Sequence, residues 1–336
     1  MRILLAGDIG GTHARFLLAR EADGSAEALF EREYLSADHA DAAAAVRTFL
    51  GVAPQPEAGR IGAACLAVAG PVTGPAEAAR AHLTNLGWDL SAPELARACG
   101  LPRLALINDF IGVATGLSRL PARDLVMLQA GQPEAQAPRV VVGAGTGLGV
   151  AMILLQDGHT SVLPSEAGHM DFAPADELQE RLRRYLKQSF GRASWERAVS
   201  GPGLLRIVSF LESQSAEPRS AVLADAMARA DPAGAIAELA LDRRDPLAGK
   251  AVDLFVAVYG SFAGNVALTL LARGGVYLAG GIAPRLASRL ADGGFIRAFT
   301  SKGRFTELLA QIPVYIVREQ RAGLLGALET ARRMPA

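Results

Sequence analysis

The chain of 336 residues is half hydrophobic, and its 34 lysines and arginines balance 34 aspartates and glutamates. At this length a single hydrophobic core usually divides, so two domains are expected. The zero net charge provides no basic surface for a nucleic acid or an anionic membrane, and neither is expected as a partner. A soluble protein with a small-molecule ligand fits this composition better.

The cysteines and the N-terminus indicate a cytoplasmic protein. Cys65 and Cys99 lack the spacing of a metal site or a disulfide framework and are expected to be reduced thiols. The N-terminal residues lead through a short apolar run to Asp8 without a signal-peptide cleavage site. Residues 254–272 are uncharged and long enough to cross a membrane, but the polar residues among them favour a buried helix of a soluble protein.

Two glycine-rich stretches each lie between apolar runs. Gly7-Asp8-Ile9-Gly10-Gly11-Thr12 separates Ile3–Ala6 from Phe16–Ala19, a spacing that favours a β-hairpin over a strand that enters a helix. Gly143-Ala144-Gly145-Thr146-Gly147-Leu148-Gly149 is placed between apolar runs in the same way. The two halves of the chain therefore each contain a glycine-rich stretch between two apolar runs, which suggests an internal duplication.

Neither stretch matches a standard nucleotide-binding motif. A P-loop requires Gly-Lys followed by Ser or Thr, and Gly249-Lys250 is followed by Ala251. A dinucleotide fingerprint requires a third glycine at the position that Leu148 occupies after Gly143-x-Gly145. Both motifs are excluded.

The remaining pattern alternates strands and helices, as in an α/β fold. Ser91 is expected to cap a helix that ends near Cys99, and Asp176 a helix that ends near Phe190. The other expected elements are helices at 41–51 and 323–333 and strands at 61–69, 104–107, 276–279 and 313–317.

No proline-rich or serine-rich linker divides the chain, so the domain boundaries are inferred from this order of elements. We expect a small α/β domain formed by residues 1–109 and 318–336 and a large α/β domain formed by residues 110–317. Asp109 then lies at the seam, where ligand clefts usually form.

Polar residues follow a buried strand at the centre of the chain. Leu104 to Ile107 run directly into Asn108 and Asp109. By itself an Asn-Asp pair after a strand usually reflects turn chemistry. The segment Glu166-Ala167-Gly168-His169 adds a carboxylate and an imidazole, which suit a hydrogen-bonding site for a polyol. Zinc is the alternative ligand, but His169 lacks companion His or Cys residues.

The paired glycine turns suggest a phosphate-bearing ligand. Backbone N–H groups approach phosphate oxygens only where no side chain intervenes, and Thr12 and Thr146 add hydroxyl donors. Asp8 is suited to hold a hydrated magnesium ion. A tight hairpin without a ligand is the alternative for each turn alone, and the later pair Gly280-Gly281 favours a nucleotide.

These motifs together resemble the bacterial glucokinases, which have the hexokinase-like, actin-type ATPase fold. The resemblance extends from Gly7 to about Gly326. It rests on six stretches in order: Gly7–Thr12, Ile107–Phe110, Gly143–Gly149, Glu166-x-Gly168-His169-x-Asp171-Phe172, Ser200-Gly201-Pro202-Gly203 and Ala279-Gly280-Gly281-Ile282. It implies a two-domain α/β fold with a ligand cleft between a small and a large domain.

The resemblance also implies an activity and a site. The activity is ATP-dependent phosphorylation of D-glucose at the 6-hydroxyl, the first step of glycolysis, by a homodimer that uses Mg²⁺. Asp109 would be the catalytic base. Glucose hydroxyls would bind Asn108, Asp109, Glu166, His169 and Glu196, although Glu196 alone would be read as a surface helix residue. ATP and magnesium would be held by Gly7, Asp8, Ile9, Gly10, Gly11, Thr12, Gly145, Thr146, Gly147, Gly280 and Gly281, with Asp8 at the metal.

Two other functions are compatible with these residues. One is a kinase of another hexose, such as mannose or fructose, because the motifs do not distinguish close epimers. The other is a non-catalytic sugar sensor that represses transcription. We expect the sensor to be the poorer fit, since only two residues precede the first predicted strand and a repressor needs a DNA-binding segment.

Overall fold

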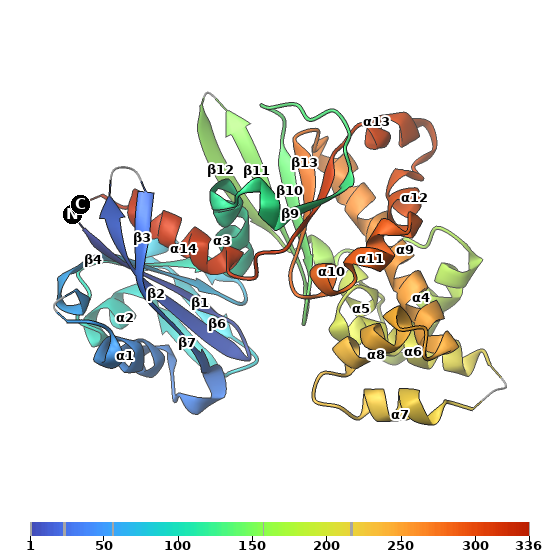
Figure 1. Ribbon diagram of the computed structural model, residues 1–336, viewed down its shortest axis with the longest axis horizontal. Helices are drawn as coiled ribbons and strands as arrows, with labels where there is room; N and C mark the ends of the chain where they lie inside the picture. Colours follow the sequence, from blue (N-terminus) through green and yellow to red (C-terminus); the bar gives the residue numbers. More distant parts are fainter. Residues whose placement is uncertain (1, 23–24, 56, 157, 216–217, 336) are drawn as a thin grey trace. The chain divides into compact units, whose positions relative to one another are not determined.

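The computed structural model describes residues 2–22, 25–55, 57–156, 158–215 and 218–335. Helices and strands alternate along the chain, which confirms the predicted α/β class (Figure 1). The chain forms two compact units: unit 1 comprises Met1–Pro121 and Arg321–Ala336, and unit 2 comprises Ala122–Gln320.

Unit 1 is built on a five-stranded sheet in the order β3-β2-β1-β4-β8. Its strands are β1 (Ile3–Ile9), β2 (His13–Ala22), β3 (Ser25–Leu35), β4 (Ile61–Val68) and β8 (Leu104–Asn108). The strands β1, β2 and β3 are antiparallel neighbours, whereas β4 and β8 run parallel to β1. The predicted hairpin at the first glycine stretch is therefore confirmed. A separate small sheet contains β5 (Val72–Thr73), β6 (Arg80–Leu83) and β7 (Trp88–Ser91).

Both faces of this sheet are buried, because side chains alternate along each strand. On one face Leu5 and Ile9 share a core with Phe49 of α1 (Ala42–Val52) and with α2 (Ala92–Ala98). On the other face Leu4, Ala6 and Cys65 pack against α14 (Ala322–Arg333). The C-terminal helix thus completes the core that the N-terminal strand begins.

The helix α3 (Asp109–Gly116) belongs to unit 1 because its backbone touches that of α14 (Figure 1). A Cβ on Gly326 would overlap the carbonyl oxygen of Gly112, and one on Gly116 would overlap that of Ala322. Only glycine allows two helices to approach so closely. The first boundary consequently lies after Pro121 and not at the predicted 109/110, and the second lies at 320/321 and not at 317/318.

Unit 2 contains a six-stranded sheet in the order β12-β11-β10-β13-β14-β9. Its strands are β9 (Leu125–Gln129), β10 (Arg139–Ala144), β11 (Leu148–Gln156), β12 (His159–Ser165), β13 (Gly275–Ala279) and β14 (Val314–Val317). The order and directions from β12 to β14 repeat those from β3 to β8 in unit 1. This repetition supports the internal duplication suggested by the sequence.

Helices cover the sheet of unit 2. They are α4 (Glu177–Phe190), α5 (Trp195–Ala198), α6 (Gly201–Ser213), α7 (Ala221–Met227), α8 (Pro232–Leu241), α9 (Pro246–Leu270), α10 (Ile282–Arg285), α11 (Ala287–Ala291), α12 (Gly294–Thr300) and α13 (Thr306–Ala310).

Short 3₁₀ helices occur in both units. They are η1 (Ser36–Asp38), η2 (Ala58–Arg60), η3 (Ala76–Ala78), η4 (Leu117–Arg119), η5 (Ala122–Asp124), η6 (Ala167–His169) and η7 (Gly303–Phe305).

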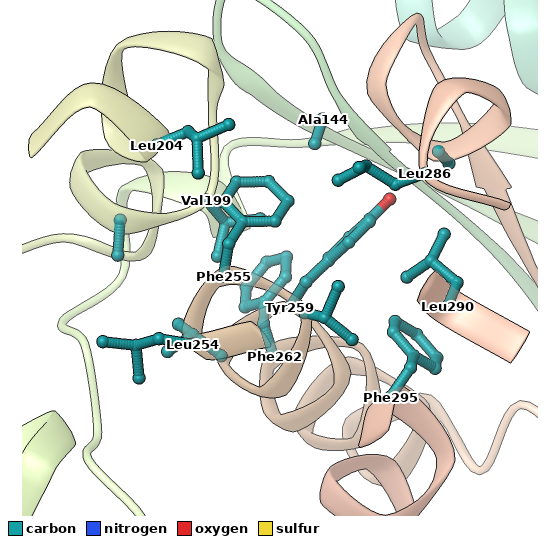
Figure 2. Close-up of a cluster of buried hydrophobic side chains, with 14 of the residues drawn as sticks. Ala144, Val199, Leu204, Leu254, Phe255, Tyr259, Phe262, Leu286, Leu290 and Phe295 are labelled. Atoms are coloured by element: carbon teal, nitrogen blue, oxygen red, sulfur yellow. The ribbon is translucent and has the colours of Figure 1, made fainter. Parts of the chain in front are cut away.

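The long helix α9 is the centre of the core of unit 2. Figure 2 shows its Phe255, Tyr259 and Phe262 among side chains from neighbouring helices, and all three are fully buried. The Tyr259 hydroxyl donates to the backbone oxygen of Val142 in β10 at 3.1 Å, which ties the helix to the sheet. Among the described residues α9 alone is long and apolar enough to cross a membrane, and 78% of its most apolar window is buried inside the unit.

Candidate active site

Asn108 ends β8 and caps α3. Its side-chain oxygen accepts hydrogen bonds from the backbone N–H groups of Phe110 (2.9 Å) and Ile111 (3.3 Å), and its side-chain nitrogen donates to the backbone oxygen of Gly70 (3.0 Å). These bonds fix the amide and hold the strand-to-helix junction. One hydrogen of the amide nitrogen is left for a ligand.

Asp109 is the first residue of α3, and its side chain is half-buried. Its Oδ1 atom accepts from the backbone N–H of Phe110 at 2.9 Å. The positive end of a helix dipole favours a charged carboxylate, which is the form that a general base requires. The contact between α3 and α14 then makes the position of this carboxylate rigid.

The first glycine stretch is divided between a strand and a turn. Gly7, Asp8 and Ile9 are part of β1, and only residues 10–12 form the turn, where the Gly10 N–H donates to the His13 oxygen at 2.9 Å. A Cβ on Gly7 would lie 2.5 Å from Leu66 in the core. Gly7 therefore packs inside the sheet, and its place in a phosphate loop stays a prediction.

Asp8 lies against the beginning of α14. A Cβ on Gly323 would be 2.7 Å from the Asp8 carboxylate, and Gly323 also contacts Gly112 of α3. Burial raises the pKa of Asp8 to about 6, although the charge of Arg15 opposes this rise. Unit 1 thus brings Asp8 close to the helix that begins with Asp109.

Asp8 fits the requirements of a magnesium ion. Among the described residues no cluster of three or more His, Cys, Asp or Glu side chains could hold a metal. Magnesium usually keeps several waters and takes one or two carboxylates together with substrate phosphates. A single half-buried carboxylate beside a glycine turn suits that mode of binding, and a bound cation would favour its charged form.

The second glycine stretch forms the β10–β11 hairpin, with Gly145, Thr146 and Gly147 as the turn. The Gly145 N–H donates to Gly147 (2.9 Å), and the Gly145 oxygen accepts from the N–H of Gly201 at the start of α6 (2.8 Å). Gly280 follows β13, the parallel neighbour of β10, and has a positive φ of 81°. The structure therefore brings both glycine motifs of unit 2 to one edge of its sheet.

Glu166 immediately precedes the 3₁₀ helix η6, and His169 is the last residue of that helix. The Glu166 Oε2 and His169 Nε2 atoms are 3.9 Å apart, and the side chains are 68% and 58% exposed. A Cβ on Gly168 would overlap the carbonyl oxygen of Leu148. This contact presses η6 against the first residue of β11, next to the glycine turn, and leaves both polar groups open to a ligand.

Glu196 is attached to the second glycine turn. Its Oε2 atom accepts the backbone N–H of Leu148 at 3.0 Å and lies against Gly147. The surface-residue interpretation of Glu196 is therefore wrong, because the side chain is half-buried. Leu148, in the second glycine stretch, contacts both parts of the predicted sugar site in unit 2, since its N–H donates to Glu196 and its carbonyl contacts the loop of Glu166 and His169.

Unit 2 also contains a cavity of about 500 Å³ next to the glycine turn. It is lined by Gly145, Thr146, Gly201, Pro202, Leu204, Leu205, Ala230, Asp231, Pro232, Ala233, Gly234, Ala237, Gly281, Ile282, Arg285 and Leu286. Most of these residues were not predicted as site residues, because the cavity walls come from helices far apart in the sequence. In the sequence, the Ser200–Gly203 stretch was the signal that could have indicated this cavity.

Comparison with known proteins identifies relatives along the whole chain. A family model described as Glucokinase matches residues 5–334. The glucokinase of Nostoc punctiforme is 40% identical over 350 residues, which cover 99% of this chain and all of the relative. A crystal structure of glucokinase from an Antarctic psychrotroph is 30% identical, with a TM-score of 0.82, and covers 99% of this chain and all of that one.

A more distant structure shares the fold. It is a ROK family glucokinase from Streptomyces griseus in complex with glucose and AMPPNP, 21% identical, with a TM-score of 0.66 and coverage of 99% of this chain and all of that one. These similarities confirm the two-domain, hexokinase-type α/β architecture that the motifs predicted.

Proposed function

The chain belongs to the glucokinase family, and from this premise we propose that it transfers the γ-phosphoryl group of ATP to the 6-hydroxyl of D-glucose. The observation that supports this most is the geometry around Leu148. There the carboxylate of Glu196 is hydrogen-bonded to the phosphate-type turn, and the loop of Glu166 and His169 packs on the same residue. The residues proposed for the sugar and those proposed for the phosphates are therefore neighbours within unit 2.

Glucose is held in this proposal by Asn108, Asp109, Glu166, His169 and Glu196. Carboxylate oxygens accept hydrogen bonds from sugar hydroxyls, and the imidazole and the amide can also donate. A site that pairs such groups with hydroxyls rejects sugars that leave them unpaired. These contacts would therefore select the hexose.

Asp109 is proposed as the general base. Its carboxylate accepts the proton of the 6-hydroxyl while that oxygen forms a bond to the γ-phosphorus, and the bond from this phosphorus to the β,γ-bridging oxygen breaks to release ADP. Such catalysis depends mainly on positioning and on stabilising charge. The rigid start of α3 supplies the positioning.

The phosphates are proposed to bind the N–H groups and hydroxyls of residues 10–12 and 145–147, beside Gly280 and Gly281. Asp8 would hold a magnesium ion, which supplies positive charge to the phosphates when bound. The cavity beside Thr146 has the volume and the largely apolar lining that suit the nucleoside part of ATP.

We also propose that the protein acts in the cytoplasm, in the first step of glycolysis, as a homodimer. The support for these points is the family resemblance and the cysteine usage. Light scattering of the purified protein measures the oligomeric state, and a mass of one chain would contradict the dimer.

A kinase of another hexose is the alternative within the same chemistry. An assay that couples ADP formation to a spectroscopic signal, run with glucose, mannose, fructose and galactose, separates the two. We expect glucose to give the highest kcat/KM with ATP. A higher value for another hexose would identify that sugar as the substrate, and absence of turnover with every sugar would contradict a kinase.

A further inference from the structure

The cavity of unit 2 has one charged wall. Asp231 and Arg285 are the charged residues in its lining, and they form an ion pair. The rest of the lining is glycine, threonine and apolar side chains. A triphosphate at the glycine turn accounts for Gly145 and Thr146 but gives this ion pair no role.

The pair is fixed to the first turn of α8. Asp231 caps this helix, since its Oδ1 atom accepts the N–H of Gly234 at 3.0 Å, while its Oδ2 atom accepts from Arg285. A Cβ on Gly234 would overlap both the carboxylate and the guanidinium. The pair therefore lies directly over the Gly234 Cα, and a glycine at this position makes that placement possible.

The carboxylate of this pair is charged at neutral pH. The hydrogen bond from Arg285 and that from the Gly234 N–H hold the pKa of Asp231 below its ordinary value. The same two side chains also line a second cavity of about 510 Å³. The pair, with both side chains 57% exposed, thus presents two opposite charges to both cavities.

We propose that the Asp231–Arg285 pair recognises the nucleoside part of the phosphoryl donor and makes adenosine the preferred nucleoside. This inference rests on the proposed function. A carboxylate accepts hydrogen bonds from ribose hydroxyls and amino groups, whereas a guanidinium donates hydrogen bonds and stacks on aromatic rings. The pair presents both kinds of group in the lining of a cavity whose other side chains are threonine and apolar residues, which suits the polar atoms of a base and a ribose.

Three variants disturb the pair in different ways. Asp231→Asn keeps the helix cap and removes the charge, because Asn caps helices as well as Asp does. Arg285→Ala removes the guanidinium. Gly234→Ala removes no charge and favours the helix, but it displaces the pair. We expect each to raise the KM for ATP by about tenfold, the usual effect of losing one hydrogen bond to a partly exposed charged group.

The controls separate the nucleoside from the phosphates. Inorganic tripolyphosphate should inhibit competitively with ATP, and its inhibition constant should stay within about twofold in all three variants, since the pair does not contact phosphates in this account. Arg289→Ala is the matched control, because Arg289 pairs with Asp253 (3.3 Å) and Asp292 (3.5 Å) and does not line the cavity. It should leave the KM for ATP unchanged.

The expected result is a raised KM for ATP, a smaller preference for ATP over ITP and 2′-deoxy-ATP, and an unchanged KM for glucose. An unchanged KM for ATP in all three folded variants would overturn this inference while leaving the proposed function intact. A parallel rise in the inhibition constant of tripolyphosphate would also overturn it. Lack of glucose phosphorylation by the parent protein would instead overturn the proposed function.

Discussion

At the scale of single residues, the side chains with an expected chemical role are held by hydrogen bonds that the sequence does not show. Asn108 caps α3 through its amide oxygen, and Glu196 accepts the N–H of Leu148. An Asn-Asp pair reads as a turn or as a helix cap with equal ease, because both use the same side-chain bonds to the backbone. The sequence does not separate the two possible roles of Gly7, since packing and phosphate binding both require a missing side chain.

Replacing Asp109 by Asn tests the base. The variant keeps the shape of the side chain and its acceptor for Phe110 but loses the basic oxygen. We expect kcat to fall by a factor of about 10² to 10⁴, or about 3 to 5 kcal/mol of transition-state stabilisation, with a much smaller change in glucose affinity. Steady-state kinetics and glucose titration by calorimetry measure the two quantities. A kcat within a few-fold of the parent value would mean that Asp109 only binds the sugar.

Glu196 and Glu166 should differ in how their loss affects the two substrates. Glu196→Ala removes the acceptor of the Leu148 N–H at the glycine turn, so it should raise the KM for glucose and also the KM for ATP, the latter by about three- to tenfold. Glu166→Ala is the matched variant, since its carboxylate is exposed and pairs with His169, and it should raise the KM for glucose alone. Equal effects of the two variants on ATP would contradict the link through Leu148.

At the scale of elements, the strands and the glycine hairpins follow from local patterns, and the structure agrees with them. The helix α3 and the domain boundaries do not follow from local patterns. They depend on the contact between α3 and α14, which are more than 200 residues apart in the chain. The cavity beside Thr146 was missed for the same reason, since its walls come from α6, α8 and α10. Local periodicity carries no information on such contacts.

Gly326→Ala tests the contact between α3 and α14. The added methyl group would overlap the carbonyl of Gly112, so the helices must separate or the variant must unfold more easily. We expect a loss of about 1 to 3 kcal/mol of stability, as in overpacked cores, and lower activity because α3 carries Asp109. Gly51→Ala in α1 is the control, since its new Cβ meets no atom within 4 Å. Denaturant unfolding that gave both variants the same stability would refute the tight crossing.

We expect a side chain in the C-terminal turn of α14 to make the stability of the fold depend on pH. Burial opposes ionisation of Glu329, but hydrogen bonds from Arg332, Arg119 and Arg333 outweigh it and lower the pKa of Glu329 to about 2. A lowered pKa stabilises the fold above the unfolded-state value near 4.5, and this contribution is lost as the pH falls toward 2. Glu329→Gln should cost about 2 kcal/mol at pH 7, since the arginines are partly exposed, and little at pH 2. A pH-independent difference in unfolding free energy would contradict this.

At the scale of the whole molecule, the two units repeat one sheet topology and each places a glycine hairpin at the corresponding position. Unit 1 contains Asp8 and Asp109, and unit 2 contains the loop of Glu166 and His169, the second glycine turn and the cavity. The two hairpins could be predicted from the sequence because each half carries its own glycine motif, whereas the chemical roles of these residues stay predictions.

The position of the transferred phosphate shows directly whether the protein phosphorylates the 6-hydroxyl of glucose. The purified protein is incubated with ATP, Mg²⁺ and D-glucose labelled with ¹³C at carbon 6, and the product is examined by ¹³C and ³¹P NMR. We predict a single sugar phosphate in which carbon 6 shows coupling to phosphorus, together with an equal amount of ADP. Phosphate on another carbon, or ADP without any sugar phosphate, would contradict the account.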